Sequence, residues 1–171
     1  GTIMYVNFIF IAIFLGYSIG SAPIISFHYG AKNNCELKNL FKKSLSLIGS
    51  WGIMLFIIAQ IISGPLAKLF VGYNAELFVM TKHGFQIFCF AFLINGFNIF
   101  GSSFFTALNN GLISAAISFL RTLVFQLSVV LILPMILGIN GIWISVAIAE
   151  LLTLCVTVTC LIRKRKVYHY I

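Results

Sequence analysis

Amide and hydroxyl side chains recur on one face of an otherwise apolar stretch of this 171-residue chain. The residues are Asn95, Asn98, Ser102, Thr106 and Asn109, at steps of 3, 4, 4 and 3, which is the spacing of one helical face. Each amide can both donate and accept hydrogen bonds, and hydrocarbon offers it no partner. The pattern therefore predicts either a wetted cavity or a polar seam between packed helices.

A second polar face follows in the next apolar stretch, where Ser114, Ser118 and Arg121 are separated by steps of 4 and 3. Arg121 and Glu150 are the charged residues that lie well inside apolar stretches. A charge at the bilayer centre costs about 2.5–3.5 kcal/mol on insertion scales, so such residues usually face the protein interior and find a partner. Counted from one end of the molecule, however, the two lie at somewhat different depths. A structural ion pair and a role in a transport path both remain open.

These residue types suit hydrogen bonding and ion pairing rather than covalent catalysis. The sequence has no Ser-His-Asp set, no paired carboxylates at one depth and no cluster of metal ligands. Its three histidines, His28, His83 and His169, lie at different edges of the apolar stretches, and its four cysteines form no C-x-x-C pair. We therefore expect a protein that is not an enzyme and that holds no metal or cofactor.

The elements that must position these residues are membrane-spanning helices. Hydrophobic residues make up 61% of the chain and charged residues 8%, more apolar surface than a soluble fold of this size can bury. About 20 mostly apolar residues cross a bilayer, and runs this continuous are helices, since a barrel strand alternates over about ten residues. The sequence predicts five helices, at residues 2–29, 43–63, 78–108, 112–133 and 142–162.

Basic residues at the helix ends predict the orientation. One cluster follows the first helix and another opens a basic tail at 163–171. The clusters consist of Lys32, Lys38, Lys42 and Lys43, and of Arg163, Lys164, Arg165 and Lys166. Because four predicted crossings separate them, both fall on one side, which the positive-inside rule makes the cytoplasm. The net charge of +8 therefore reflects membrane orientation rather than nucleic-acid binding.

Small residues at helical spacing predict close helix contacts, because they let helix backbones approach each other in a membrane. The two ladders are Ala12, Gly16 and Gly20, and Ser145, Ala149 and Thr153. We expect both ladders to lie at helix–helix interfaces.

Four stretches, in this order and spacing, resemble the C-terminal half of bacterial multidrug and toxic compound extrusion (MATE) transporters, in their MepA-type branch. They are PIISFHYGAKN (23–33), LFVGYNAEL (69–77), SSFFTALNNGLISAAISFLRTLVF (102–125) and LPMILGINGIWISVAIAELL (133–152). The family-motif positions are Pro23, Tyr29, Gly30, Gly138, Gly141 and Trp143. One branch of the family has an ion-binding aspartate in the tenth helix, where the aligned residue here is the neutral Asn95. An aspartate-like position in the last helix falls on Glu150.

The resemblance implies an all-α integral membrane fold with twelve helices in two six-helix lobes. Residues 1–171 would supply helices eight to twelve, most of the C-terminal lobe. It further implies a secondary active exporter of small cationic amphipathic compounds, which exchanges them for protons or sodium ions by alternating access between the lobes. The expected location is the bacterial inner membrane, with a cytoplasmic C-terminus. The expected partners are membrane lipid and the missing N-terminal lobe of the same polypeptide.

The resemblance also suggests roles for the polar residues inside the helices. We expect a set of polar residues to line or brace the wall that faces the missing lobe. They are Asn95, Asn98, Ser102, Ser114, Ser118, Arg121 and Glu150. With a neutral residue at Asn95, coupling to the ion would rest on the missing lobe, which in the family carries an acidic site in its first helix.

Two other functions remain open at this point. A flippase for lipid-linked saccharides, from the same superfamily, would need a wide basic cavity, and Arg121 is the basic residue inside the apolar stretches. A small non-transporting membrane subunit, complete at 171 residues, fits poorly with the initial Gly1 and with the lack of charge before Lys32. We expect upstream coding sequence for a homologous lobe.

Overall fold

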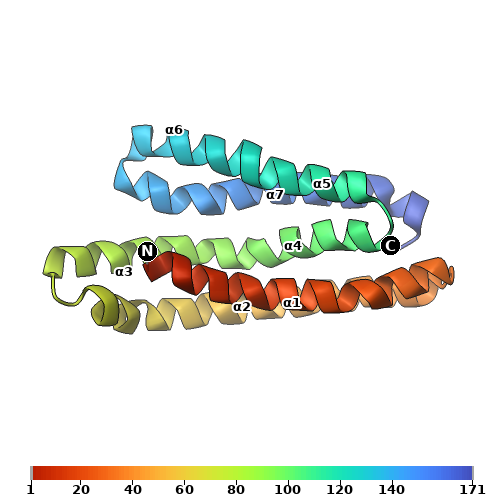
Figure 1. Cartoon of the computed structure of the whole chain (residues 1–171), viewed down its shortest axis with the longest axis horizontal. Helices are drawn as coiled ribbons and strands as arrows, with labels where there is room; N and C mark the ends of the chain where they lie inside the picture. Colours follow the sequence, from red (N-terminus) through yellow and green to blue (C-terminus); the bar gives the residue numbers. More distant parts are fainter. Residues whose placement is uncertain (1, 171) are drawn as a thin grey trace.

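The computed structural model describes residues 2–170, which form long helices bundled along one common axis (Figure 1). The elements are α1 (Thr2–Gly30), α2 (Asn34–Val71), α3 (Ala75–Phe88), η1 (Cys89–Ala91), α4 (Phe92–Ala107), α5 (Gly111–Phe119), η2 (Leu120–Gln126), α6 (Leu127–Leu137) and α7 (Ile139–Tyr168). Since α3, η1 and α4 run on without a break, as do α5, η2 and α6, the described residues form five rods. All five are long and apolar enough to span a membrane, which confirms the predicted fold class.

Most rods extend beyond the predicted spans because a helix continues past the hydrocarbon until a cap ends it. The Asn33 side chain accepts a hydrogen bond from the Glu36 N–H at 3.2 Å and starts α2 nine residues before the predicted residue 43. At the other end of the chain, α7 continues to Tyr168. The basic segment from Arg163 onward is therefore mostly part of this helix rather than a separate tail.

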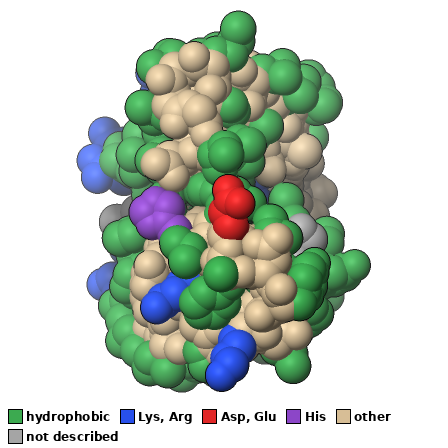
Figure 2. Space-filling model, turned by 90° about the vertical axis from the view of Figure 1, so that its left-hand side faces the viewer, with side chains coloured by type: hydrophobic (Ala, Val, Ile, Leu, Met, Phe, Trp, Pro, Cys, Tyr) green, Lys and Arg blue, Asp and Glu red, His purple; other side chains and the backbone are tan. Residues whose placement is uncertain are grey.

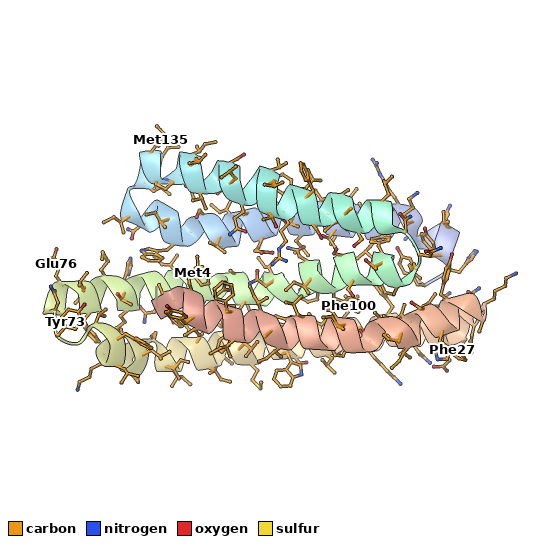
Figure 3. The ribbon with its side chains drawn as sticks, in the orientation of Figure 1. Met4, Phe27, Tyr73, Glu76, Phe100 and Met135 are labelled. Carbon is orange, nitrogen blue, oxygen red and sulfur yellow. The ribbon has the colours of Figure 1, made fainter. Side chains whose placement is uncertain are left out.

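The helix α4 lies at the centre of the bundle and contacts α1, α2, α5 and α7. Its core is rich in phenylalanine: Phe100 is 1% exposed, and its ring centroid lies 5.6 Å from that of Phe104. Figure 3 shows the contrast with Phe27 and Met135, which project from the outer surface. Because lipid is as apolar as these side chains, close packing rather than removal from water holds such helices together.

The two ladders of small residues have different surroundings. Ser145, Ala149 and Thr153 are each at most 2% exposed, which confirms the predicted interface for α7. Among the described residues, Ala12, Gly16 and Gly20 form no such interface and are exposed on α1. Within the described residues, a Cβ added at Gly16 or Gly20 would meet nothing within 4 Å. The opposite face of α1 packs instead, through larger side chains that include Phe10 and Phe14.

Both basic clusters lie at one end of the bundle, which we call the basic end. Figure 1 shows that α1 and α7 finish at the same end of the bundle. The rings of Tyr29, at the end of α1, and Tyr168, at the end of α7, are 5.7 Å apart there. The opposite end carries the charged residues Lys68, Glu76 and Lys82. Figure 2 looks onto that end and shows it covered mostly by hydrophobic and uncharged groups. The predicted common side of the two basic clusters is confirmed as a common end of the bundle.

After α7 the chain folds back into the basic end. His169 has a left-handed backbone with φ 54°, and Tyr170 beyond it is fully buried. The Tyr170 ring lies 5.1 Å from Phe41 and 5.0 Å from Phe104, and its hydroxyl donates to the Leu161 carbonyl at 2.7 Å. Burial raises the pKa of the Tyr170 hydroxyl above its ordinary value. Tyr170 thus closes the interior of the bundle at this end.

The turn between α6 and α7 depends on glycine. Gly138 has φ 59° and ψ −142°, a conformation that essentially only glycine adopts without strain. Gly138→Ala is therefore expected to cost about 1–3 kcal/mol of stability, measured by unfolding of the intact polypeptide in detergent. Gly30→Ala is the control, because a Cβ there would meet nothing within 4 Å among the described residues. Equal effects of the two substitutions would contradict the role of the turn.

Candidate functional site

The carboxylate of Glu150 lies between α7 and its neighbours and is 5% exposed. Its Oε1 accepts a hydrogen bond from Arg121 Nε at 2.8 Å, and Arg121 Nη2 lies 2.7 Å from the same oxygen. The ion pair that the sequence left open is therefore formed. The difference in depth along the two helices is bridged by the long arginine side chain, which remains 21% exposed.

Two amides of α4 complete the surroundings of this carboxylate. Asn98 Nδ2 donates to Glu150 Oε2 at 2.7 Å and to the Glu150 carbonyl at 2.8 Å. With its nitrogen turned toward Glu150, the Asn95 amide donates to Oε1 at 2.9 Å and to Oε2 at 3.2 Å. The Thr157 hydroxyl in turn donates to Asn98 Oδ1 at 3.1 Å. This part of the asparagine stripe is a polar seam, since both amides are 1% exposed.

Arg121 is positioned by a π-helical segment, η2, which interrupts the rod formed by α5 and α6. A π-helical turn holds more residues than an α-helical turn, so it rotates the side chains around it relative to a regular helix. Such segments often occur at functional sites. The sequence does not predict this feature, because the mixture of apolar residues with Arg121, Thr122 and Gln126 in Leu120–Gln126 is equally compatible with a regular α-helix.

Hydroxyl side chains form a second group next to the ion pair. Ser102 Oγ lies 2.9 Å from Ser114 Oγ and 2.9 Å from Ser118 Oγ, and the Thr106 hydroxyl donates to Ser114 Oγ at 2.7 Å. A cleft of about 280 Å³ opens here between α1, α4, α5 and η2, lined in part by Ser18, Ser102, Ser118 and Arg121. Small polar solutes and water are the ligands that such a lining suits.

The seven predicted site residues therefore come together in two adjoining groups. We call Asn95, Asn98, Arg121, Glu150 and Thr157 the carboxylate cluster, and Ser102, Thr106, Ser114 and Ser118 the hydroxyl cluster. Arg121 belongs to the first and also lines the cleft beside the second. Sequence reasoning missed Thr157 as a member, although it continues the four-residue ladder of α7 that begins at Ser145.

The family-motif positions lie outside both clusters. Pro23 and Gly30 are in the second half of α1, and Tyr29 packs against Tyr168. Gly138 and Gly141 form the α6–α7 turn, where a Cβ at Gly141 would lie 2.5 Å from the Leu133 carbonyl oxygen. Trp143 covers Gly84 of α3 so closely that a Cβ there would lie 2.5 Å from the indole. These positions shape the turns and close helix contacts of the bundle.

A larger cavity of about 500 Å³ lies toward the end opposite the basic end, among α1, the end of α2, α3, η2, α6 and α7. Its lining is mainly apolar, with Thr81, Thr122 and Gln126 as polar groups and Trp143 as an aromatic one. Within the described residues, the buried Trp143 Nε1 lacks a hydrogen-bond partner. This volume and this mixture of linings are those of small-molecule sites. Among residues 2–170, no three or more His, Cys, Asp and Glu side chains lie together in a group that could hold a metal ion.

Comparison with known proteins gives two matches. The MatE family model matches residues 1–132 of this chain. The chain is also similar to the solved structure of the Vibrio cholerae MATE transporter VcmN in the bent form, with a TM-score of 0.82 and 18% sequence identity. This likeness covers 94% of the present chain but 37% of VcmN, so the chain spans little more than a third of that transporter. A search of curated proteins gave no match.

Proposed function

Because the chain belongs to the MatE family, a family of multi-pass membrane transporters and not enzymes, we propose that it forms most of one lobe of a secondary active exporter. The lobe would work by alternating access against a second lobe of the same polypeptide. The helical fold shared with part of VcmN supports this proposal. So does the presence of five rods, since transporters of this kind are built from repeated helical units that rock against each other.

The observation that carries the proposal is the Arg121–Glu150 pair, held by amides inside a membrane-spanning bundle next to a hydroxyl-lined cleft. Charged groups at such depth are costly and mark ion or substrate pathways by default. We infer that both clusters brace or line the wall facing the second lobe. Coupling to protons or sodium ions would then involve Glu150 together with acidic groups of the second lobe, since Asn95 carries no charge.

Small cationic amphipathic compounds are the substrates we propose. The mainly apolar cavity of about 500 Å³, with its aromatic Trp143 and neutral amide Gln126, supports this class. Apolar walls with a few polar groups suit flat amphipathic molecules, and aromatic faces attract cations. The basic end would face the cytoplasm of a bacterium, with the C-terminus on that side of the inner membrane.

The test uses Asn98→Leu in the intact polypeptide, with efflux of organic cations as the readout. This change removes both hydrogen bonds that Asn98 donates to Glu150. Hydrogen bonds to charged groups contribute about 1.5–3 kcal/mol, so efflux is expected to fall by about tenfold or more at a normal protein level. Asn39→Leu, on an exposed face of α2, is the control. Unchanged efflux would remove Asn98 from the path.

Deletion of the gene separates the exporter from the flippase of the same superfamily. Loss of resistance to organic cations supports the exporter, whereas a cell-wall or polysaccharide defect supports the flippase. The engagement of Arg121 by Glu150 disfavours the flippase, because it occupies the guanidinium that would hold an anionic lipid phosphate.

A further inference from the structure

A groove runs between α2 and α7, with α4 as its floor, and Thr157 is the member of the carboxylate cluster that lines it. Its volume is about 380 Å³, and its lining is almost wholly apolar. The side chains along it include Phe41, Leu45, Phe97, Leu154, Val158 and Leu161. In a membrane-spanning bundle, a groove of this composition suits a hydrocarbon chain.

Basic residues continue both walls of the groove at the basic end. On α2, Lys38 lies three residues before Phe41, and Lys42 lies three residues before Leu45. On α7, Arg165 follows Leu161 by four residues. Residues three or four apart lie on the same side of a helix, so these three cations stand on the groove side of their helices.

Several other charges of the basic end point away from the groove. Lys43 and Arg163 are rotated by about 180° from the groove-lining faces of α2 and α7, at about 100° per residue. The acidic residue of this segment, Glu36, is five residues before Phe41 and also lies away from that face. The groove therefore ends between cations of two helices.

We propose that this groove binds one anionic phospholipid, phosphatidylglycerol. An acyl chain lies against Phe97 and Val158, and the phosphodiester lies between Lys38 and Arg165. Charge complementarity selects this headgroup over a zwitterionic one, because lysine attracts phosphate as a point charge and arginine binds it through two parallel N–H groups. Tyr170 closes the interior of the bundle beside the groove, with its hydroxyl bonded to the Leu161 carbonyl, so the headgroup stays at the surface.

The test measures lipid binding to the intact, delipidated polypeptide by native mass spectrometry, with phosphatidylglycerol and phosphatidylcholine titrated separately. One phosphatidylglycerol is expected to remain bound under conditions that remove phosphatidylcholine. The double variant Lys38→Gln/Arg165→Gln is expected to weaken phosphatidylglycerol binding by about 30-fold, which is about fivefold for each cation near an anionic headgroup. Lys43→Gln/Arg163→Gln removes the same charge from the same helices and is expected to change binding by less than about threefold.

Equal losses in the two double variants would overturn the proposal, because they would show attraction to the whole basic end. No loss of binding in either double variant would overturn it as well.

A second pair of variants tests the groove without changing charge. Val158→Trp fills the groove, whereas Leu152→Trp places the same ring on another exposed face of α7. Binding is expected to be lost in Val158→Trp alone, and equal binding in both contradicts the site. Thermal unfolding of each variant shows whether it is folded. The lipid site depends on membrane insertion and not on export. Normal efflux without lipid binding would therefore overturn the lipid site and leave the proposed function standing.

Discussion

Glu150→Gln is expected to destabilise the intact polypeptide by about 3–5 kcal/mol and to reduce efflux more than any other single change in the carboxylate cluster. The substitution leaves the guanidinium of Arg121 inside the bundle without its counter-charge, where it lies 2.7 Å from Glu150 Oε1 in the native protein. Thermal unfolding in detergent and efflux of organic cations measure the two effects. Glu76→Gln, at the exposed start of α3, is the control and is expected to change neither.

The double variant Arg121→Gln/Glu150→Gln separates the two roles that the sequence left open for this pair. Because it removes both charges, it is expected to recover most of the stability lost in the single variant. Recovered stability without recovered efflux assigns the pair to transport, and recovery of both assigns it to structure. If the single variant Glu150→Gln were as stable as the native protein, the buried ion pair described here would not contribute to the fold.

Gly96→Ala is also expected to lower stability strongly, through packing alone. A Cβ at Gly96 would lie 2.6 Å from Phe14 Cε1 and 2.7 Å from Ile48 Cγ2. Both neighbours are 2% exposed and have little room to move, so α1 and α2 must shift away from α4. Overpacking of this kind costs about 1–3 kcal/mol, measured as a lower unfolding temperature or denaturant midpoint.

Gly49→Ala is the matched control for this prediction, since it makes the same change in the interior of α2. The added Cβ would lie 3.5 Å from the end of the Phe97 ring, which is an ordinary contact. Alanine favours a helix over glycine by about 1 kcal/mol, so Gly49→Ala is expected to be neutral or stabilising. If the two substitutions shifted stability in the same direction, the close approach at Gly96 would not limit the packing.

The sequence predicted the features that depend on composition and spacing. The five spans and the common end of the basic clusters follow from hydropathy and from the positions of residues such as Lys38 and Lys166. The spacing of Asn95, Asn98 and Ser102 placed them on one face of α4, where the structure has them. These signals are readable because a polar group inside a membrane is costly and its position is therefore constrained.

Other features depend on contacts between helices and have no local signal. The π-helical η2 positions Arg121 in the ion pair, but its sequence has no pattern that distinguishes a π-helix from an α-helix. The tail residue Tyr170 suits the headgroup region by its amphipathic ring, yet it packs between Phe41 and Phe104. Similarly, glycine permits a close helix contact without requiring one, so Gly16 remains on an open face while Gly96 is enclosed.

The hydrogen bonds around Glu150 have a mechanical consequence. They fasten the middle of α4 and the π-helical turn η2 to α7 through charged and amide groups. With no water in the hydrocarbon to replace those bonds, sliding one of these three segments past another is costly. Any change of shape during a transport cycle would therefore carry them together as one rigid block. Bending would be left to the glycine turn between α6 and α7 and to the connections at the bundle ends.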